Sequence, residues 1–240
     1  MSASGDLIIK PQQPGKKKGI GLNFPTIMFS VLGLLTLGLF AFVTIRPIQV
    51  LPRITLAPGY SLIDANGDAV TNEDFRGSLV LYNFTYLNCE TPCLETTGVM
   101  QELQARLDEI DTGGIPVQLV TISFDPERDT PSAMKAAATQ LGVDSEAWTF
   151  MTGTPERLKW VIGGGFGVYY EERNPGEFVF SPAFMLVDGA GVLRGEYWTE
   201  APETDRILRD FRLVAEEVKN RQGVANYAYD AAHLFLCYPR

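Results

Sequence analysis

The sequence is poor in histidine, cysteine and positive charge. Its 240 residues include one histidine, His233, and three cysteines, and a metal site built on His233 and Cys237 alone would lack further ligands. Lys and Arg number 20 against 29 Asp and Glu, giving a net charge of −9, which argues against nucleic acid as a partner. Internal repeats are absent, and so is low-complexity sequence beyond residues 11–19. The length and aromatic content fit one globular domain plus an anchor.

One long segment lacks charge altogether. Residues 26–45 carry no charged side chain, and as a helix they would reach ~30 Å, the thickness of a bilayer's hydrocarbon core. A cleaved signal peptide is the alternative, but the run ends at Arg46-Pro47 without a small-residue cleavage site. Lys10 and residues 16–18, all Lys, precede the segment. The positive-inside rule therefore predicts a single-pass protein of the cell (inner) membrane with a cytoplasmic N-terminus and a periplasmic or extracellular domain.

The composition divides the chain into five parts. We expect a cytoplasmic basic tail at 1–24, a transmembrane anchor at 25–45, an extended linker at 46–58, a folded domain at 59–222 and a C-terminal docking tail at 223–240. The basic tail contributes four Lys and one Asp, net +3, so the total of −9 leaves −12 on the remainder. That acidity argues against binding to an anionic lipid surface, and it favours a basic protein partner.

The folded domain shows alternating strand and helix signals. Asn66-Gly67 predicts the turn of a short hairpin, and the next elements predicted are buried strands at 78–86 and 116–124, each followed by a helix. The second of these helices begins with Pro131, capped by Asp129 or Thr130. The remaining expected elements are a strand at 148–151, a helix at 155–162, a hairpin at 183–198 and a closing amphipathic helix at 202–220.

Two cysteines lie between the first long strand and its helix. Four residues along a helix advance ~6 Å, which brings Cys89 and Cys93 to one face and within reach of a disulfide. A helix N-terminus favours the thiolate, which prepares both sulfurs as nucleophiles or as soft ligands for Cu(I). A static disulfide, a redox-active pair and a metal site all remain open. Cys237 would then be a free thiol or form an intermolecular link.

This order of elements resembles a thioredoxin-like α/β fold with an extra N-terminal β-hairpin, preceded by one transmembrane helix. The motifs resemble the Sco/SenC family, membrane-anchored proteins that serve assembly of the copper site in cytochrome oxidase. Besides the cysteine pair and the final hairpin, the matching stretches are "SFDPERDTP" at 123–131, "TGTPE" at 152–156 and "FGVYY" at 166–170. Together they cover residues 59–220.

The resemblance implies a copper site of both cysteines plus one histidine just ahead of the final hairpin. Phe180 and Ser181 stand at that place here, and neither is a ligand for a cuprous ion. His233, in the C-terminal tail, is a weak third candidate. Ser181-Pro182 also occupies the place of the cis-proline in thioredoxin-like proteins, so we expect a cis bond there and count Pro182 with the cysteines as a redox candidate.

Other side chains have less specific interpretations. Four methionines fall within predicted elements and are expected to fill the core rather than bind copper: Met100, Met134, Met151 and Met185. Asp125, Arg128 and Asp129 line the cysteine pocket if the resemblance holds, although a helix cap and a local ion pair explain them equally well.

Three functions are compatible with these features: a copper chaperone, a periplasmic thiol-disulfide oxidoreductase, and a non-catalytic subunit of a larger assembly. We favour an accessory subunit or assembly factor of a respiratory or photosynthetic electron-transport complex, such as alternative complex III or cytochrome oxidase. Enzymatic activity is not favoured. The expected partners are the membrane and the subunits of that complex. Cys89 and Cys93 are expected to form a disulfide, and no cofactor is expected, with copper as the alternative.

Overall fold

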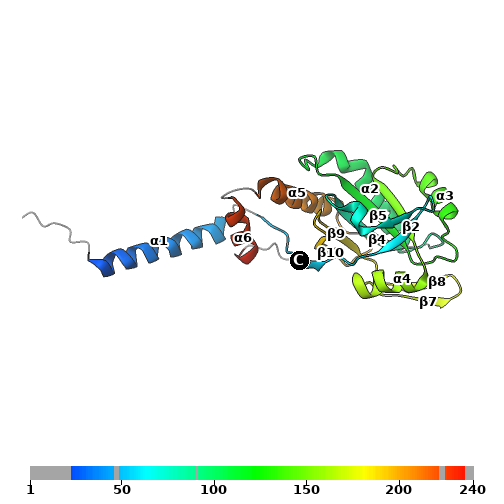
Figure 1. The fold of residues 1–240 in the computed structure, drawn as a ribbon, viewed down its shortest axis with the longest axis horizontal. Helices are drawn as coiled ribbons and strands as arrows, with labels where there is room; N and C mark the ends of the chain where they lie inside the picture. The colour runs from blue at the N-terminus through cyan, green and yellow to red at the C-terminus, as the bar shows by residue number, and fades with distance from the viewer. Residues whose placement is uncertain (1–22, 46–48, 90, 222–224, 236–240) are drawn as a thin grey trace, which may run out of the picture. The chain divides into compact units, whose positions relative to one another are not determined.

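The computed structural model describes residues 23–45, 49–89, 91–221 and 225–235 (Figure 1). The chain forms two units, one holding helix α1 and the other comprising the chain from residue 46 onward. Helix α1 spans Phe24–Ile45. Within the described part of the chain it is the one helix long and apolar enough to cross a membrane, with a mean hydropathy of 2.0 over Phe24–Phe42. This agrees with the uncharged run seen in the sequence.

The second unit alternates strands and helices in the order expected of a thioredoxin-like fold. Its strands are β1 Thr55–Leu56, β2 Ser61–Asp64, β3 Ala69–Thr71, β4 Leu79–Thr85, β5 Val117–Ser123, β6 Trp148–Thr152, β7 Tyr170–Asn174, β8 Glu177–Phe180, β9 Phe184–Val187 and β10 Val192–Tyr197. Its helices are η1 Asn72–Phe75, α2 Cys93–Arg106, η2 Leu107–Glu109, α3 Pro131–Leu141, α4 Pro155–Leu158, η3 Lys159–Gly165, α5 Thr204–Asn220 and α6 Ala225–Phe235.

Eight strands form one mixed sheet in the order β1-β10-β9-β4-β5-β6-β2-β3. The central strands β4, β5 and β6 are parallel, which requires crossover helices between them, and α2 and α3 supply these crossovers. The final hairpin β9–β10 adds antiparallel to β4. The hairpin β2–β3, turned at Gly67 with φ +89°, joins the other edge through β6. This confirms the predicted fold with its extra N-terminal hairpin.

The sheet separates two hydrophobic cores, because successive side chains of β4 point to opposite faces. Leu79 and Leu81 pack under α2, α3 and α5, whereas Val80, Tyr82 and Phe84 pack toward α4, η3 and the β7–β8 hairpin. Figure 1 shows these two layers on either side of the sheet. All seven residues of β4 are buried, so the strand that leads to the cysteines is rigidly held.

Local signals placed most helix ends correctly. Thr130 caps α3, its side chain accepting a hydrogen bond from the Ala133 N–H, and Pro131 is the first helical residue. The helix predicted at 155–162 is different: α4 ends at Leu158 and continues as a π-helical turn to Gly165. Glycine is required at position 165, since a Cβ there would lie 2.4 Å from Pro58.

Residues 49–58, which the sequence places in an extended linker, are partly built into the second unit. Val50 and Leu51 are buried, and β1 pairs with β10. The Arg194 guanidinium donates hydrogen bonds to the carbonyl oxygens of Leu51 and Pro52, at 2.9 and 3.1 Å. The chain therefore enters the folded unit through a fixed segment.

Candidate functional site

The cysteine pair lies at the carboxyl end of β4, where the chain turns into α2. Cys93 is the first residue of α2 and is buried, while Cys89 is partly buried on the preceding loop. The two sulfurs form a disulfide, with 5.7 Å between the Cα atoms. Its position at the N-terminus of a 14-residue helix favours the thiolate form after reduction.

Asp129 fixes the loop that carries Cys89. One of its carboxylate oxygens accepts a hydrogen bond from the Leu87 N–H at 2.9 Å and another from the Ser123 hydroxyl. Burial raises the pKa of this carboxyl, and the two hydrogen bonds oppose that effect. Asp129 therefore supports the cysteine loop through the Leu87 backbone. The residue that caps α3 is Thr130, not Asp129.

Asp125 and Arg128 form a second support. The Arg128 guanidinium contacts the buried Asp125 carboxylate at 2.5 Å and Glu172 on β7 at 3.1 Å. Gly176 packs against this guanidinium, because a Cβ at that position would lie 2.9 Å from its central carbon. The ion pair thus ties the β7–β8 hairpin to the end of β5.

Aromatic rings fill the space beside the cysteine loop. The Tyr86 ring lies 5.1 Å from that of Phe178 and 6.3 Å from that of Phe180, and Phe124 packs against all three. Phe180, which stands where the resemblance places a histidine, is therefore part of an apolar cluster. Its ring offers no lone pair to a metal.

The cis-proline expectation is wrong. The cis peptide bond in the described part of the chain is Thr91–Pro92, inside the cysteine loop, whereas Ser181–Pro182 is trans. The Ser181 N–H donates to the Tyr169 carbonyl at 2.9 Å, and Pro182 leads directly into β9. A proline just before a strand needs no N–H, so the trans form fits there.

A cleft of about 440 Å³ opens beside the disulfide. Its walls come from α2 and α3, and small or apolar side chains line much of it, including Leu94, Ala133, Ala136 and Leu141. Cys89 and Cys93 both line it, so a partner entering the cleft would meet the sulfurs directly.

The structure places His233 far from the cysteines. Its Nε2 atom lies 2.9 Å from a carboxylate oxygen of Glu217 on α5. Glu217 lines a cavity with Leu79, at one end of β4, whereas Thr85, at the other end, lines the cleft with the cysteines. Seven residues of strand separate these ends by ~20 Å. His233 therefore does not join the cysteine site in this fold, and Cys237 lies outside the described residues.

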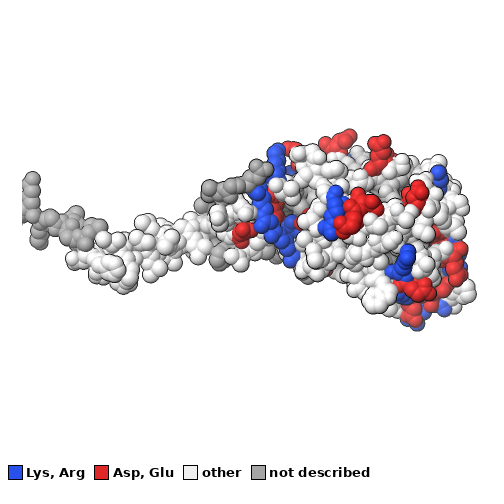
Figure 2. Space-filling model, viewed as in Figure 1, with Lys and Arg blue, Asp and Glu red and all other residues white. Residues whose placement is uncertain are grey.

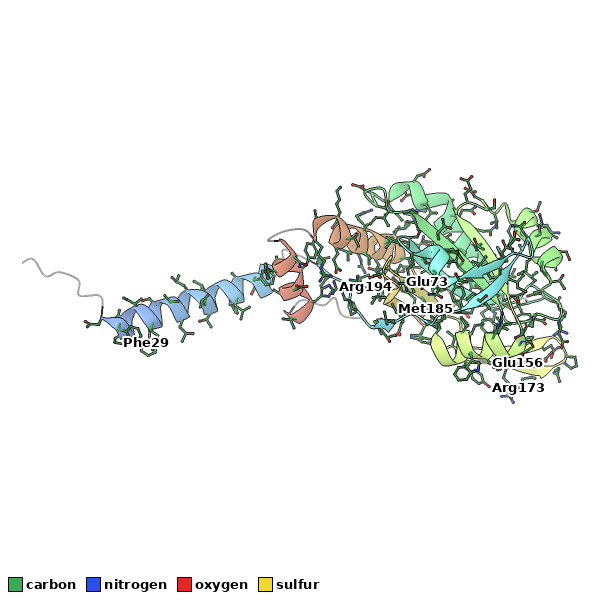
Figure 3. The ribbon with its side chains drawn as sticks, in the orientation of Figure 1. Phe29, Glu73, Glu156, Arg173, Met185 and Arg194 are labelled. Atoms are coloured by element: carbon green, nitrogen blue, oxygen red, sulfur yellow. A yellow bond between two sulfur atoms is a disulfide. The ribbon has the colours of Figure 1, made fainter. Side chains whose placement is uncertain are left out.

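Glu217 and Arg194 form a buried charge cluster that sequence reasoning missed. Arg194, on β10 and labelled in Figure 3, contacts Asp188 at 3.0 Å and Glu217 at 2.5 Å. Arg53 contacts Glu217 at 2.5 Å. Both Arg194 and Glu217 are 2% exposed. The single hint in the sequence was an arginine within an apolar hairpin strand. Asp188 lies in the same hairpin, but the other partners, Glu217 and the carbonyls of Leu51 and Pro52, come from other segments of the chain.

This cluster predicts a loss of stability in acid. Burial would raise the pKa of Glu217, but the hydrogen bond with His233 and the contacts with Arg194 and Arg53 lower it from 4.5 to about 2. Between these values the unfolded chain binds more protons than the folded one. The contribution of Glu217 to the free energy of unfolding is therefore complete above about pH 5 and is lost as the pH falls toward 2. Urea unfolding at several pH values measures it, and Glu217→Gln should flatten the dependence in that window. An equally steep dependence in the variant would contradict the prediction.

The described residues contain no group of three His, Cys, Asp or Glu side chains arranged to hold a metal. Four of the sequence-predicted residues do gather at one end of the sheet, with Cys89 and Cys93 at the end of β4 and Asp125 and Asp129 after β5. The predicted core methionines Met100, Met134, Met151 and Met185 are all buried.

Comparison with known proteins identifies the fold and the family. The SCO1/SenC family profile matches residues 50–216. The chain belongs to the SCO1/SenC family. It is 26% identical over 156 residues to the SCO1 protein homolog of Bacillus subtilis, covering 64% of this chain and 79% of that protein. The solved structure of a SCO1/SenC family lipoprotein from Bacillus anthracis superposes with a TM-score of 0.61 at 24% identity, covering 67% of this chain and 95% of the other.

The relatives also correct our expectation that no cofactor binds. A putative copper-binding protein of Stutzerimonas stutzeri is 29% identical over 151 residues, covering 62% of this chain and 72% of that protein. The structure of Arabidopsis thaliana ScoI has copper bound; it matches with a TM-score of 0.58 at 23% identity, over 65% of this chain and 98% of that one. In the described part of the chain no imidazole lies beside Cys89 and Cys93. Because Sco relatives bind copper, that observation does not justify the expectation that this chain binds no copper.

Proposed function

We propose that this chain is a membrane-anchored Sco/SenC protein that assists assembly of the copper site of cytochrome oxidase, and that Cys89 and Cys93 handle the copper. The observation that carries the proposal is the cysteine pair at the start of α2, beside an open cleft, in a SCO1/SenC chain. A solved relative, BsSco, is described as a member of the Sco family of cytochrome c oxidase assembly proteins and as having a disulfide switch.

The donor atoms fit a cuprous ion. Two thiolates are soft ligands of the kind that Cu(I) prefers. Thiol–disulfide exchange with an external dithiol, which is itself oxidised to a disulfide, would reduce the Cys89–Cys93 bond and free both sulfurs. The N-terminus of α2 would stabilise them as thiolates. Copper is the cargo in this proposal, and the chain's own residues supply the two sulfurs and the support from Asp129.

The anchored location rests on α1. An uncharged helix of 22 residues is long enough to span a bilayer, and the lysines before it favour a cytoplasmic N-terminus. The folded unit would then face the periplasm or the cell exterior. That compartment permits the disulfide.

A permanent accessory subunit of an electron-transport complex is the second candidate. The observation that favours it is the apolar cluster of Tyr86, Phe124 and Phe180, which includes the position where the resemblance places a histidine. A third ligand would then have to come from a partner. Alternative complex III or cytochrome oxidase would be the host.

Deletion of the gene for this chain in its native organism tests both candidates. Under the assembly proposal, the deletion strain yields cytochrome oxidase with a copper-poor centre, measured by metal analysis and by the optical absorption of the site. A Cys89→Ser/Cys93→Ser chain should fail to restore the copper, and Cys237→Ser should restore it. Fully loaded oxidase in the deletion strain would refute the assembly role. Stoichiometric co-purification of the tagged chain with a complex would then support the subunit.

A further inference from the structure

Helix α6 presents an outward apolar stripe. Tyr227 and Leu234 are 76% and 79% exposed, and residues seven apart lie on the same face of a helix, with Ala231 between them. The opposite face is packed, because Tyr229 and Ala232 are buried. These buried residues fix which face of α6 packs against the folded unit, and the opposite face exposes two large side chains to solvent.

Contacts at both ends fasten α6 to α5. The Arg221 guanidinium donates to the Asn226 side chain at 2.7 Å and to Asp230 at 2.9 Å. Near the other end, His233 pairs with Glu217. The exposed stripe thus lies on a helix that side-chain contacts fix against α5.

The same Glu217 oxygen that meets His233 also meets Arg53, on the segment that enters the folded unit. Helix α6 and Arg53 therefore contact the same carboxylate oxygen, so α6 lies close to residues 50–53, the entry segment of the folded unit. The buried Val50 follows Ile45, the end of α1, by five positions, and an extended chain of that length reaches at most ~18 Å.

Basic side chains accompany this region. Arg53, Lys219 and Arg221 come from the entry segment and the end of α5, and Figure 2 shows Lys and Arg gathered at that end of the larger unit. A short helix with Tyr and Leu outward and arginines at its margin has the character of an interfacial helix. Two of these side chains are paired with carboxylates, Arg53 with Glu217 and Arg221 with Asp230, so they offset negative charge beside α6.

We infer that α6 lies on the bilayer surface, with Tyr227 and Leu234 in the boundary between headgroups and acyl chains. The partner is the phospholipid of the membrane that α1 crosses, so the inference rests on α1 being a span and is independent of copper. Tyrosine suits this depth because its ring is apolar and its hydroxyl stays in water. The helix would thereby orient the cysteine cleft relative to the membrane.

Photo-cross-linking of the full chain in nanodiscs of phosphatidylcholine and phosphatidylglycerol tests this inference. Replacement of Tyr227 by p-benzoylphenylalanine should give a phospholipid adduct by mass spectrometry. The same replacement at Tyr169, also exposed but ahead of β7, should give none. If the Tyr227 variant misfolds, Leu234 provides a second position. No lipid adduct at either α6 position, equal adducts at Tyr169, or cross-links to a second copy instead of lipid would overturn the inference.

Discussion

Arg194→Ala should lower the free energy of unfolding by about 3–5 kcal/mol, the range for breaking a buried ion pair by removing one partner. The guanidinium contacts two carboxylates, Asp188 and Glu217, and two backbone carbonyls of the entry segment. Its removal would leave these buried groups without their donor. Because the entry segment and α6 both depend on Glu217, the loss should loosen them together.

Arg106→Ala is the matched control. Arg106 contacts three carboxylates, those of Glu102, Glu109 and Asp205, and it does so at the surface. Exposed ion pairs contribute about 1 kcal/mol or less each, so removing all three should cost less stability than the Arg194→Ala variant loses. Urea unfolding followed by circular dichroism gives both values, and hydrogen exchange reports on residues 50–53. A similar loss in the two variants would show that burial of the cluster does not determine its contribution.

The reduced chain should bind one equivalent of Cu(I), and Cys89→Ser or Cys93→Ser should abolish that binding. A single thiolate cannot replace the pair, because the other residues that line the cleft include no Cys, His or Met. The oxidised chain, with its disulfide closed, should bind none. Titration against a chromophoric Cu(I) chelator measures the stoichiometry.

Two variants serve as controls for the copper experiment. Cys237→Ser should retain binding if Cys89 and Cys93 are sufficient. His233→Ala should also retain it, since His233 pairs with Glu217 at the opposite end of β4. Loss of binding in His233→Ala, with the fold intact, would mean that the C-terminal tail reaches the cysteines and that the arrangement of α6 is wrong.

Local patterns predicted the fold well because they report on short stretches of backbone. Asn66-Gly67 indicated a hairpin, and Thr130-Pro131 indicated a helix start; both are present. The short β7–β8 hairpin was missed. It packs as a separate two-stranded sheet over one face, held by Arg128 and by the rings of Tyr86 and Phe124, which directly follow β4 and β5. Such support is invisible in its own sequence.

The sequence by itself determined the long apolar helix, the order of strands and helices, and the placement of Cys89 and Cys93 after β4, because each depends on composition or spacing within one segment. Only the tertiary structure decided the partners of Arg194, the trans bond at Pro182 and the position of His233. These features depend on which distant segments the sheet brings together. A charged or aromatic side chain takes its role from the neighbours that the fold supplies.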